Sequence, residues 1–406
     1  MAVLARTNTN RANRMSWRQA VPLACLACAV FVFNSSEFMP MALLSDIALS
    51  FNVTESDAGM IISLYAWAVM ILSLPLMMVG TRLSFRNLLL VVMAVFLAGQ
   101  VASVLAPTFL ALTTARLVVA AAHAVFWSIV TPVATRIVDE EHAPLAMSII
   151  VGSSSVATIV GLPLGRSIGI LLGWRATFLC IAGATALILV ALTAFLPWMQ
   201  KDEPFTLRML PSLARNRHLI VTYGVTILVA TGYYLGYSYI EPFLQQIGGM
   251  SDSSITLALS VFGCAGIVGS VLFSRPAHLS NEMRVGLPVF AICCALLLMA
   301  FASHTLVTFF AICVLWGAGS SFFNAALQSI ILKRTSPEST ATAMSIFSGL
   351  FNLGIGLGAW LGGLVINTAG IAWIGVAGSA VVFAGLGSVM LGALVCFGQL
   401  RLRAVE

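Results

Sequence analysis

Long apolar runs separated by short polar stretches make up almost the whole of this 406-residue chain. Twelve of the runs are long enough for a helix to cross the hydrocarbon core of a membrane, which takes about 20 residues. They lie near residues 19–42, 57–80, 87–106, 109–135, 144–168, 176–197, 219–245, 253–274, 284–303, 305–331, 339–367 and 371–398. Such runs are too long and too unbroken for the strands of a membrane barrel. The pattern predicts an all-α integral membrane protein with twelve transmembrane helices.

The second half of the chain repeats parts of the first half at a fixed distance. Residues 146–149 (AMSI) return 197 positions later as residues 343–346. Three glycines keep the same offset, because Gly152, Gly161 and Gly165 correspond to Gly349, Gly358 and Gly362. In a membrane, two copies of one unit are typical of a transporter whose halves rock around a central site. We therefore predict two six-helix bundles.

The boundary between the bundles is expected at the longest interior polar stretch of the chain. We assign residues 1–18 to an N-terminal tail, 19–197 to the first bundle, 198–218 to a linker, 219–398 to the second bundle and 399–406 to a C-terminal tail. No other loop is long enough to hold a soluble domain.

Composition and charge support a membrane protein and predict its orientation. Sixty per cent of the residues are apolar, 8% are charged and the mean hydropathy is +1.03. Of the 20 Lys and Arg residues, 17 lie in the two tails or in the loops after spans two, four, six, eight and ten. Because positively charged loops stay in the cytoplasm, we expect both termini there. The net charge of +6 then reflects topology and gives no reason to expect a nucleic acid as partner.

Two ionisable residues inside the predicted spans are the candidates for proton coupling. Glu37 in span one and Arg116 in span four are each roughly two turns from the same side of the membrane, so they could meet. An ionisable side chain inside a span costs about 2.5–3.5 kcal/mol, so each requires a reason. Burial disfavours an ionised carboxylate and a guanidinium favours it, so small movements of the pair would change its proton occupancy. We interpret Glu37 and Arg116 as a proton-coupling pair; the alternative is a static ion pair that pins two helices.

Polar and aromatic residues in spans one, four, seven and ten are the candidates for substrate binding. We assign this role to Asn34, His123, Trp127, Tyr234, Tyr237, Asn324 and Gln328. Amides bond hydroxyl groups and flat rings stack on the C–H faces of a sugar, so this set suits an uncharged, hydroxyl-rich ligand. It would also suit an amphipathic drug. For His123 the alternative is a core histidine bonded to a neighbouring helix, and for the tyrosines an interfacial belt.

Glycines and a proline in span five, and an acid near the end of span seven, are candidate gating residues. Gly161, Pro163 and Gly165 would let helices approach closely or bend, although in lipid such glycines usually serve packing. Glu241 lies close to the outer boundary of span seven, where it could form a solvated gate. The eight cysteines lie in or beside apolar spans without the partners of a metal site, so we expect small hydrophobic fillers and no metal or cofactor.

Long strings of this sequence resemble the major facilitator superfamily, its drug:proton antiporter branch, and within it the bacterial sugar efflux transporters. The strings are residues 33–38 (FNSSEF), 43–47 (LLSDI), 65–67 (YAW), 122–129 (AHAVFWSI), 161–166 (GLPLGR), 173–175 (GWR) and 237–243 (YSYIEPF). The resemblance implies a central cavity lined by spans one, four, seven and ten, and export against an inward proton gradient across a bacterial inner membrane.

The resemblance also assigns roles to single residues. Arg116 is similar to the span-four arginine thought to serve proton coupling, and Gly161, Pro163 and Gly165 are similar to the span-five antiporter motif. One departure concerns the loop after span two, which reads TRLSFR at 81–86 and lacks the usual aspartate. Arg82 and Arg86 remain there as candidates for holding the inner side closed.

The sequence therefore predicts a monomeric, proton-coupled transporter that exports sugars or sugar-like molecules from the cytoplasm by alternating access. An antiporter of drugs or other small metabolites on the same fold is the alternative. A polytopic membrane enzyme would need a cluster of acids or histidines at one membrane face. The only such run, residues 139–142 (DEEH), is interpreted as a solvated loop, so no enzymatic activity is expected. The partners are then a sugar, protons and the lipid bilayer.

Overall fold

The computed structural model describes residues 15–80, 82–199, 213, 215–275, 280–302 and 305–403. Within these ranges the chain forms helices joined by turns, and no strand occurs there. Twelve helices are long and apolar enough to cross a membrane, as predicted. The predicted tail up to residue 14, the linker residues 200–212 and 214, and residues 404–406 lie outside the described residues.

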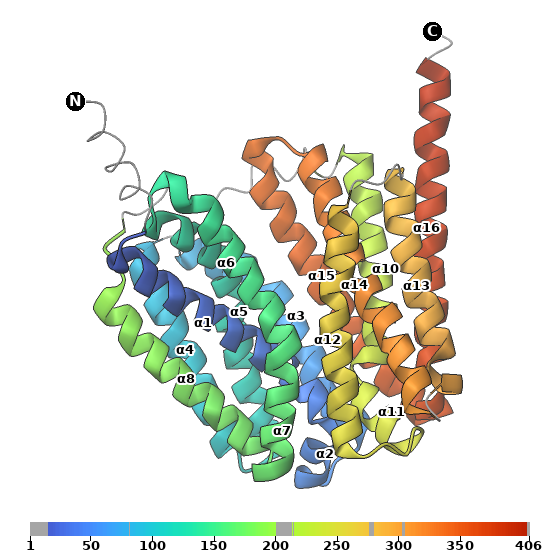
Figure 1. Cartoon of the computed structure of the whole chain (residues 1–406), viewed down its shortest axis with the longest axis horizontal. Coiled ribbons are helices and arrows are strands. Elements are labelled where there is room, and N and C mark those ends of the chain that lie inside the picture. The colour runs from blue at the N-terminus through green and yellow to red at the C-terminus, as the bar shows by residue number, and fades with distance from the viewer. Residues whose placement is uncertain are drawn as a thin grey trace, which may run out of the picture.

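The first half of the chain forms the group of helices on the left and in the centre of Figure 1. Its spans are α1 (Trp17–Ala42), α3 (Glu55–Gly80), α4 (Phe85–Leu105), α5 (Phe109–Ile137), α6 continued by η2 and α7 (Ala143–Val156, Ala157–Gly161 and Leu162–Leu172), and α8 (Trp174–Phe195). The short helix η1 (Glu140–His142) leads into α6, and α2 (Leu44–Phe51) follows α1.

The second half forms the group on the right of Figure 1. Its spans are α10 (Arg217–Tyr237) continued by α11 (Ile240–Gln246), α12 (Asp252–Ser274), α13 (Asn281–Ala302), α14 (Leu306–Arg334), α15 (Pro337–Ala369) and α16 (Ile374–Arg403), with η4 (Ile371–Trp373) before α16. Helix α16 thus runs through residues 399–403, which the sequence assigned to a tail.

The internal repeat extends to the residues that begin and end helices. Thr108 and Thr305 lie 197 positions apart, and each side-chain oxygen accepts a hydrogen bond from the backbone N–H three residues later, which caps α5 and α14. Gly173 and Gly370 keep the same offset and have φ values of 87° and 94°, which favour glycine. Each allows the tight turn before the last span of its half.

The first span of each half is broken at corresponding places. The chain leaves helical geometry at Leu43 (φ −130°, ψ 27°) and at Tyr239 (φ −117°, ψ 19°), within one residue of the repeat offset. The short helices α2 and α11 follow these breaks and contact each other across the two halves. The predicted span 19–42 ends at the first of these breaks, whereas the predicted span 219–245 runs across the second.

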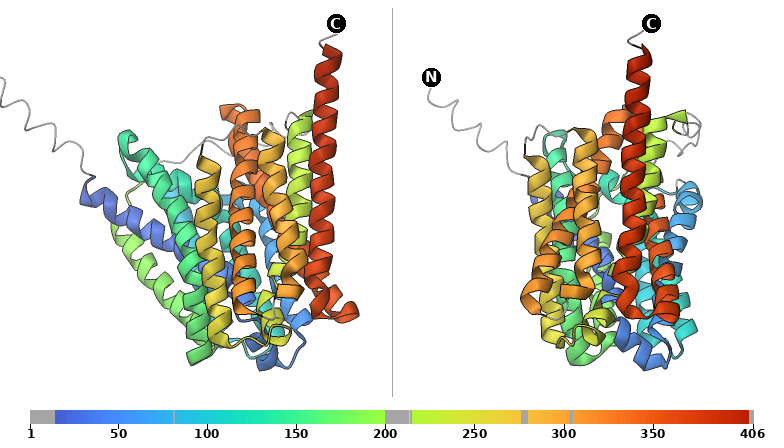
Figure 2. Two further views of the ribbon diagram at one scale, coloured as in Figure 1. Left: turned by 45° about the vertical axis from the view of Figure 1, so that its right-hand side comes forward. Right: turned by 90° about the vertical axis from the view of Figure 1, so that its right-hand side faces the viewer.

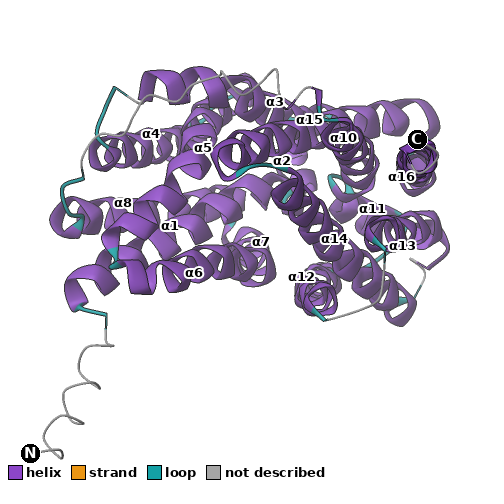
Figure 3. Cartoon of the chain, turned by 90° about the horizontal axis from the view of Figure 1, so that it is seen from above, coloured by secondary structure: helices purple, strands orange, loops and turns teal. Residues whose placement is uncertain are grey.

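The two halves converge at one end of the molecule. In Figures 1 and 2 they meet at the end where α2 and α11 lie, which we call the clamp end, and they diverge toward the end where α16 stops. Figure 3 shows α3 and α15 side by side between the halves. These helices approach closely, since a Cβ on Gly356 would lie 2.3 Å from the Trp67 ring.

Glycines also allow α1 to pack tightly against span five. A Cβ on Gly161, Gly165 or Gly169 would lie within 2.5 Å of Ser35, Met39 or Leu43, respectively. Both sets recur at every fourth residue, so side chains of one helix fill the space left by small residues of the other. The π-helical turn η2 ends two residues before Pro163, whose missing N–H cannot complete a regular α-helix.

The repeated glycines differ in how much space surrounds them, which gives a test of the fold. A Cβ on Gly358 would lie 2.4 Å from the Thr231 carbonyl oxygen, a backbone atom of α10, whereas nothing lies within 4 Å of the same atom on Gly152. We expect Gly358→Ala to destabilise the purified protein by about 1–3 kcal/mol through overpacking. Gly152→Ala should be neutral or stabilising, because alanine favours the helix. Thermal unfolding in detergent measures both, and equal effects would contradict this packing.

Candidate transport cavity and flanking charge clusters

A cavity of about 650 Å³ lies between the two halves, within the size range of small-molecule sites. Helices α1, α6, α10, α12 and α14 form most of its wall. The polar side chains that line it are Asn34, Ser154, Ser155, Thr158, Tyr233, Tyr234, Tyr237, Ser270, Ser320, Ser321, Asn324 and Gln328. The other lining residues are apolar or glycine, and none of the residues that line this cavity is charged.

The structure brings together five of the seven residues predicted to bind substrate. Asn34, Tyr234, Tyr237, Asn324 and Gln328 line the cavity, and each half contributes to this set. The remaining two belong to α5 and lie outside the lining: His123 is buried and Trp127 is half-buried. The residues predicted to bind substrate are thus divided between the cavity wall and helix α5.

The amide groups in the cavity are held by neighbouring side chains. Asn34 Nδ2 donates a 2.7 Å hydrogen bond to Ser154 Oγ, and Gln328 Nε2 donates to Asn324 Oδ1. An amide has two donors and an acceptor, so each wall keeps free hydrogen-bonding groups for a ligand. The two pairs lie in different halves, so one ligand can bond both halves at once.

A serine and threonine wall from span five was missed in the sequence. Ser154, Ser155 and Thr158 line the cavity, although the run of serines at 153–155 inside an apolar span could have indicated them. The signal is weak because hydroxyl groups in membrane helices commonly bond their own backbone. Ser155 Oγ donates to Val151 O at 3.3 Å, and Thr158 Oγ1 donates to Ser154 O, also at 3.3 Å.

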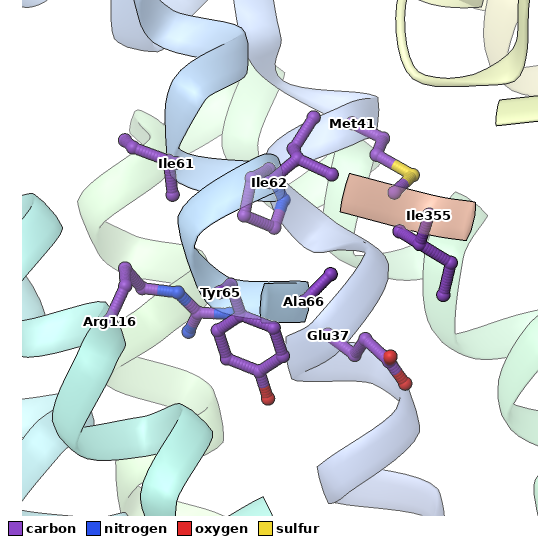
Figure 4. Close-up of a pocket in the computed structure, with 9 residues that line it drawn as sticks. Glu37, Met41, Ile61, Ile62, Tyr65, Ala66, Arg116 and Ile355 are labelled. Atoms are coloured by element: carbon purple, nitrogen blue, oxygen red, sulfur yellow. The ribbon is translucent and has the colours of Figure 1, made fainter. Parts of the chain in front are cut away.

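Glu37 and Arg116 line the same small pocket beside the cavity, but they form no direct ion pair within 4.0 Å. Arg116 is buried and binds the neighbour of Glu37: its Nη1 donates to Ser36 Oγ at 3.0 Å and its Nη2 to Ser36 O at 2.7 Å. Its guanidinium carbon also lies 5.0 Å from the centre of the Tyr65 ring. In Figure 4 this ring lies between Arg116 and Glu37.

His123 is the residue that contacts Glu37. Its Nε2 lies 3.5 Å from Glu37 Oε2 and also accepts a 2.7 Å hydrogen bond from Trp127 Nε1. Its Nδ1 is buried and has no partner. The two α5 residues that lie outside the cavity lining therefore form a cluster with the predicted proton carrier.

A second charge cluster joins the two halves at the clamp end. Arg166 of α7 and Glu241 of α11 are almost fully buried, with 1% and 2% of their side chains exposed. Arg166 Nη1 lies 3.2 Å from Glu241 Oε1 and Nη2 lies 3.0 Å from Asp252 Oδ1 of α12. Nη1 also donates to Ala42 O at the end of α1. We call Arg166, Glu241 and Asp252 the clamp.

Further polar contacts between the halves surround the clamp. Glu241 Oε2 accepts a 3.1 Å hydrogen bond from the backbone N–H of Ser45, in the first turn of α2, where a negative charge stabilises a helix. Gln246 Nε2 donates to Glu55 Oε1 at 2.6 Å, and Asn367 Nδ2 donates to Ser56 Oγ at 3.0 Å. Glu241, predicted as a gating residue, therefore caps a helix of the opposite half.

Asp46 on α2 adds a further carboxyl group close to the clamp. Burial raises the pKa of Asp46 above its ordinary value, the Arg166 guanidinium opposes this change, and the Asp252 carboxylate adds to it. The single arginine of the clamp is thus surrounded by more acids than it can pair with one to one.

The other predicted gating residues lie within the first half. Gly161, Pro163 and Gly165 belong to the surface of span five, on which the two glycines pack against α1. Arg86 Nε donates to Leu196 O at 3.0 Å, beyond the end of α8, whereas Arg82 is exposed. Their assignment to gating remains a prediction.

No group of three or more His, Cys, Asp and Glu side chains in the described part of the chain could hold a metal ion. The acidic run 139–142 forms the short helix η1 and its cap, and its three acids are exposed.

Comparison with known proteins defines the class. Residues 26–295 and 222–401 match the Major Facilitator Superfamily. The chain belongs to this superfamily of membrane transporters, in agreement with its fold, its internal repeat and the motifs noted above.

Relatives cover almost the whole chain. It is 39% identical over 372 residues to a "probable sugar efflux transporter" of Mannheimia succiniciproducens, spanning 92% of this chain and 93% of the relative. A protein of Helicobacter pylori with the same name is 40% identical over 353 residues, spanning 87% and 90%.

Solved structures confirm the fold at low sequence identity. A bacterial homologue of the human lysosomal transporter Spinster has a TM-score of 0.75 at 15% identity, over 93% of this chain and 97% of that protein. The human organic anion transporter MFSD10 has a TM-score of 0.63 at 15% identity, over 91% and 98%.

The contacts of the clamp indicate that the Arg166 charge holds the two halves together at this end. We expect Arg166→Gln to separate the clamp end, because Glu241 would remain buried without its cation, a change that costs about 3–5 kcal/mol. Spin labels on cysteines at the exposed positions Leu49 and Ser253 should show longer distances in this variant. Arg175→Gln is the matched control, since Arg175 Nη2 bonds Ala106 O within the first half. Equal distance distributions in the wild type and Arg166→Gln would contradict the assignment.

Proposed function

We propose that this protein exports neutral sugars or sugar-like molecules from the cytoplasm in exchange for protons. The observation that carries the proposal is the cavity between the halves, whose wall contains hydroxyl, amide and aromatic groups but no charge. The relatives named as probable sugar efflux transporters, at about 40% identity over most of the chain, support the same substrate class.

The uncharged wall favours sugars over hydrophobic cations. A cation taken from water into a cavity of low dielectric needs a nearby negative charge to offset its desolvation. Glu37 is not among the cavity-lining residues and instead contacts His123. A neutral ligand with several hydroxyl groups finds donors and acceptors on both walls. Neutral amphipathic drugs remain the second candidate, because much of the wall is apolar.

The aromatic residues of α10 provide a stacking surface. Tyr233 and Tyr237 line the cavity with ring centres 5.3 Å apart, and Phe262 follows at 5.0 Å from Tyr237. Rings of this kind pack against the C–H faces of a sugar while their hydroxyl groups bond to its oxygen atoms. The amides opposite can then select among hydroxyl patterns.

We further propose that the clamp end faces away from the cytoplasm. This orientation follows from the positively charged loops, which place both termini inside the cell. The structure then corresponds to an inward-facing state, in which the clamp seals the outer side and the sugar enters from the cytoplasm. The bundles at 19–197 and 219–398 would rock as units around the cavity. One chain contains the complete cavity, so a monomer suffices.

Proton coupling is assigned to Glu37 because of its place on α1. Four consecutive residues of this helix contact four different sites. Asn34 lines the cavity, and Ser35 packs against Gly161 of span five. Ser36 accepts hydrogen bonds from the Arg116 guanidinium, and Glu37 contacts His123. A change in the charge of Glu37 therefore acts on the helix that also carries a sugar contact. Arg116 bonds Ser36, the residue next to this acid.

Glu37→Gln tests the proton-coupling assignment. A glutamine keeps the shape of the side chain but cannot take up or release a proton. We expect inverted vesicles or liposomes acidified inside to accumulate labelled sugar with the wild type, and not with Glu37→Gln, while equilibrium sugar binding persists. Accumulation that survives both this substitution and a proton uncoupler would rule out the coupling role.

Asn324→Ala tests the cavity as the sugar site. Loss of one amide hydrogen bond costs about 0.5–1.5 kcal/mol, so the dissociation constant should rise about 2- to 10-fold. Asn352→Ala is the control, because Asn352 is a buried amide on α15 outside the cavity lining, bonded to Ser348 O. Titration of purified protein with sugars, glycosides and hydrophobic cations measures both affinity and selectivity. Preferential binding of cations, or equal losses in both variants, would reject the proposed site.

A further inference from the structure

The Nε2 atom of His123 faces two groups that cannot both bond to it. Trp127 Nε1 donates to it at 2.7 Å, and Glu37 Oε2 lies 3.5 Å away. An indole N–H can only donate, so Nε2 presents its lone pair and the imidazole carries its proton on Nδ1. An ionised carboxylate can only accept, so in this arrangement it faces a lone pair and forms no hydrogen bond.

A proton that reaches this pair changes which group bonds Nε2. If the proton is on Glu37, the acid O–H becomes a second donor to the same lone pair. If it is on His123, the lone pair disappears and the new N–H donates to the Glu37 carboxylate. In both cases the indole N–H loses its acceptor.

We infer that His123 is a further proton-coupling residue, and that protonation of the Glu37–His123 pair displaces the Trp127 N–H from Nε2. The inference rests on the proposed proton-coupled transport and names a second residue for it. The proton stays within the pair and no bond other than hydrogen bonds changes. Trp127 is half-buried, so its released N–H can turn to another acceptor or to water.

The surroundings of His123 leave few other groups for this role. Helix α3 contributes Tyr65, whose ring centre lies 5.7 Å from that of His123, and α5 itself contributes Arg116. On α10, Tyr234 lies within electrostatic reach of Glu37. Helix α6 has no ionisable side chain. The only ionisable side chain on α4 is that of Arg86, which donates a hydrogen bond to Leu196 O just after the end of α8. Helix α3 also carries Glu55 and Asp57 in its first turn, and Glu37 is the acid that contacts His123.

Two substitutions of Glu37 separate this mechanism from a merely structural contact. In Glu37→Gln, the side-chain amide can donate to Nε2 without a proton, so Trp127 should be released at every pH. In Glu37→Leu, no donor competes, so Trp127 should stay on Nε2 until the imidazole itself is protonated at a lower pH. The wild type should change between the two states with pH.

The indole N–H signals of the full-length protein in lipid nanodiscs, labelled with 15N-tryptophan, provide the readout. Trp127→Phe identifies the Trp127 signal, and Trp316, whose buried Nε1 has no partner, is the internal control. We expect a downfield Trp127 signal at neutral pH in the wild type and Glu37→Leu, and an upfield signal in Glu37→Gln. Equal Trp127 signals in the two variants, with the Trp316 signal unchanged in both, would overturn the inference.

A transport measurement adds an independent readout. Trp127→Phe keeps an aromatic ring and removes the competing donor, so the pair should hold its proton more firmly. The midpoint of the pH dependence of accumulation should rise by up to about one unit, which corresponds to about 1.4 kcal/mol. An unchanged midpoint would count against the displacement. The indole signals do not depend on transport, so a pH-driven shift without proton-coupled accumulation would refute the proposed function alone.

Discussion

The cost of placing a charge in hydrocarbon is the constraint on which the rest of this structure depends. Each buried charge needs a partner inside the protein, and one helix provides a contact to several of them. Arg116 bonds Ser36, Arg166 bonds Ala42 O, and Glu37 itself belongs to the same helix, α1. Helix α1 therefore links the first half to the clamp, to the cavity and to the proposed proton site.

Much of the fold could be predicted from the sequence, because lipid makes long apolar runs the dominant signal. The twelve spans follow from hydropathy, the internal repeat follows from residues kept at one offset, and the superfamily is indicated by the resemblance of several residue strings to its members. The repeat extends even to cap residues such as Thr108 and Thr305, since the same backbone turn needs the same side chain. Five of seven predicted binding residues line the cavity because they are polar groups that lipid would not tolerate.

The parts of the site that were not predicted depend on how each helix is rotated about its own axis, which this sequence hardly specifies. Spans that are apolar all round do not indicate which face meets a neighbour. His123 and Trp127 belong to the predicted binding set, although His123 contacts Glu37 and Trp127 bonds His123 instead. The breaks at Leu43 and Tyr239 lie within three residues of Pro40 and Pro242, but the apolar pattern of these spans does not locate them.

The break at Leu43 provides one of the hydrogen-bond acceptors for the clamp arginine. A helix that ends leaves carbonyl groups without partners, and Arg166 binds the one on Ala42 while its charge meets Glu241 of the other half. Ala42 lies five residues beyond Glu37 on the same continuous helix, roughly 7.5 Å along its axis. A displacement of α1 at the proposed proton site therefore reaches the clamp through little more than one helical turn, which contains Pro40, and the same helix carries Asn34 into the cavity. This arrangement places the proposed proton site, a ligand contact and a contact of the clamp on one helix.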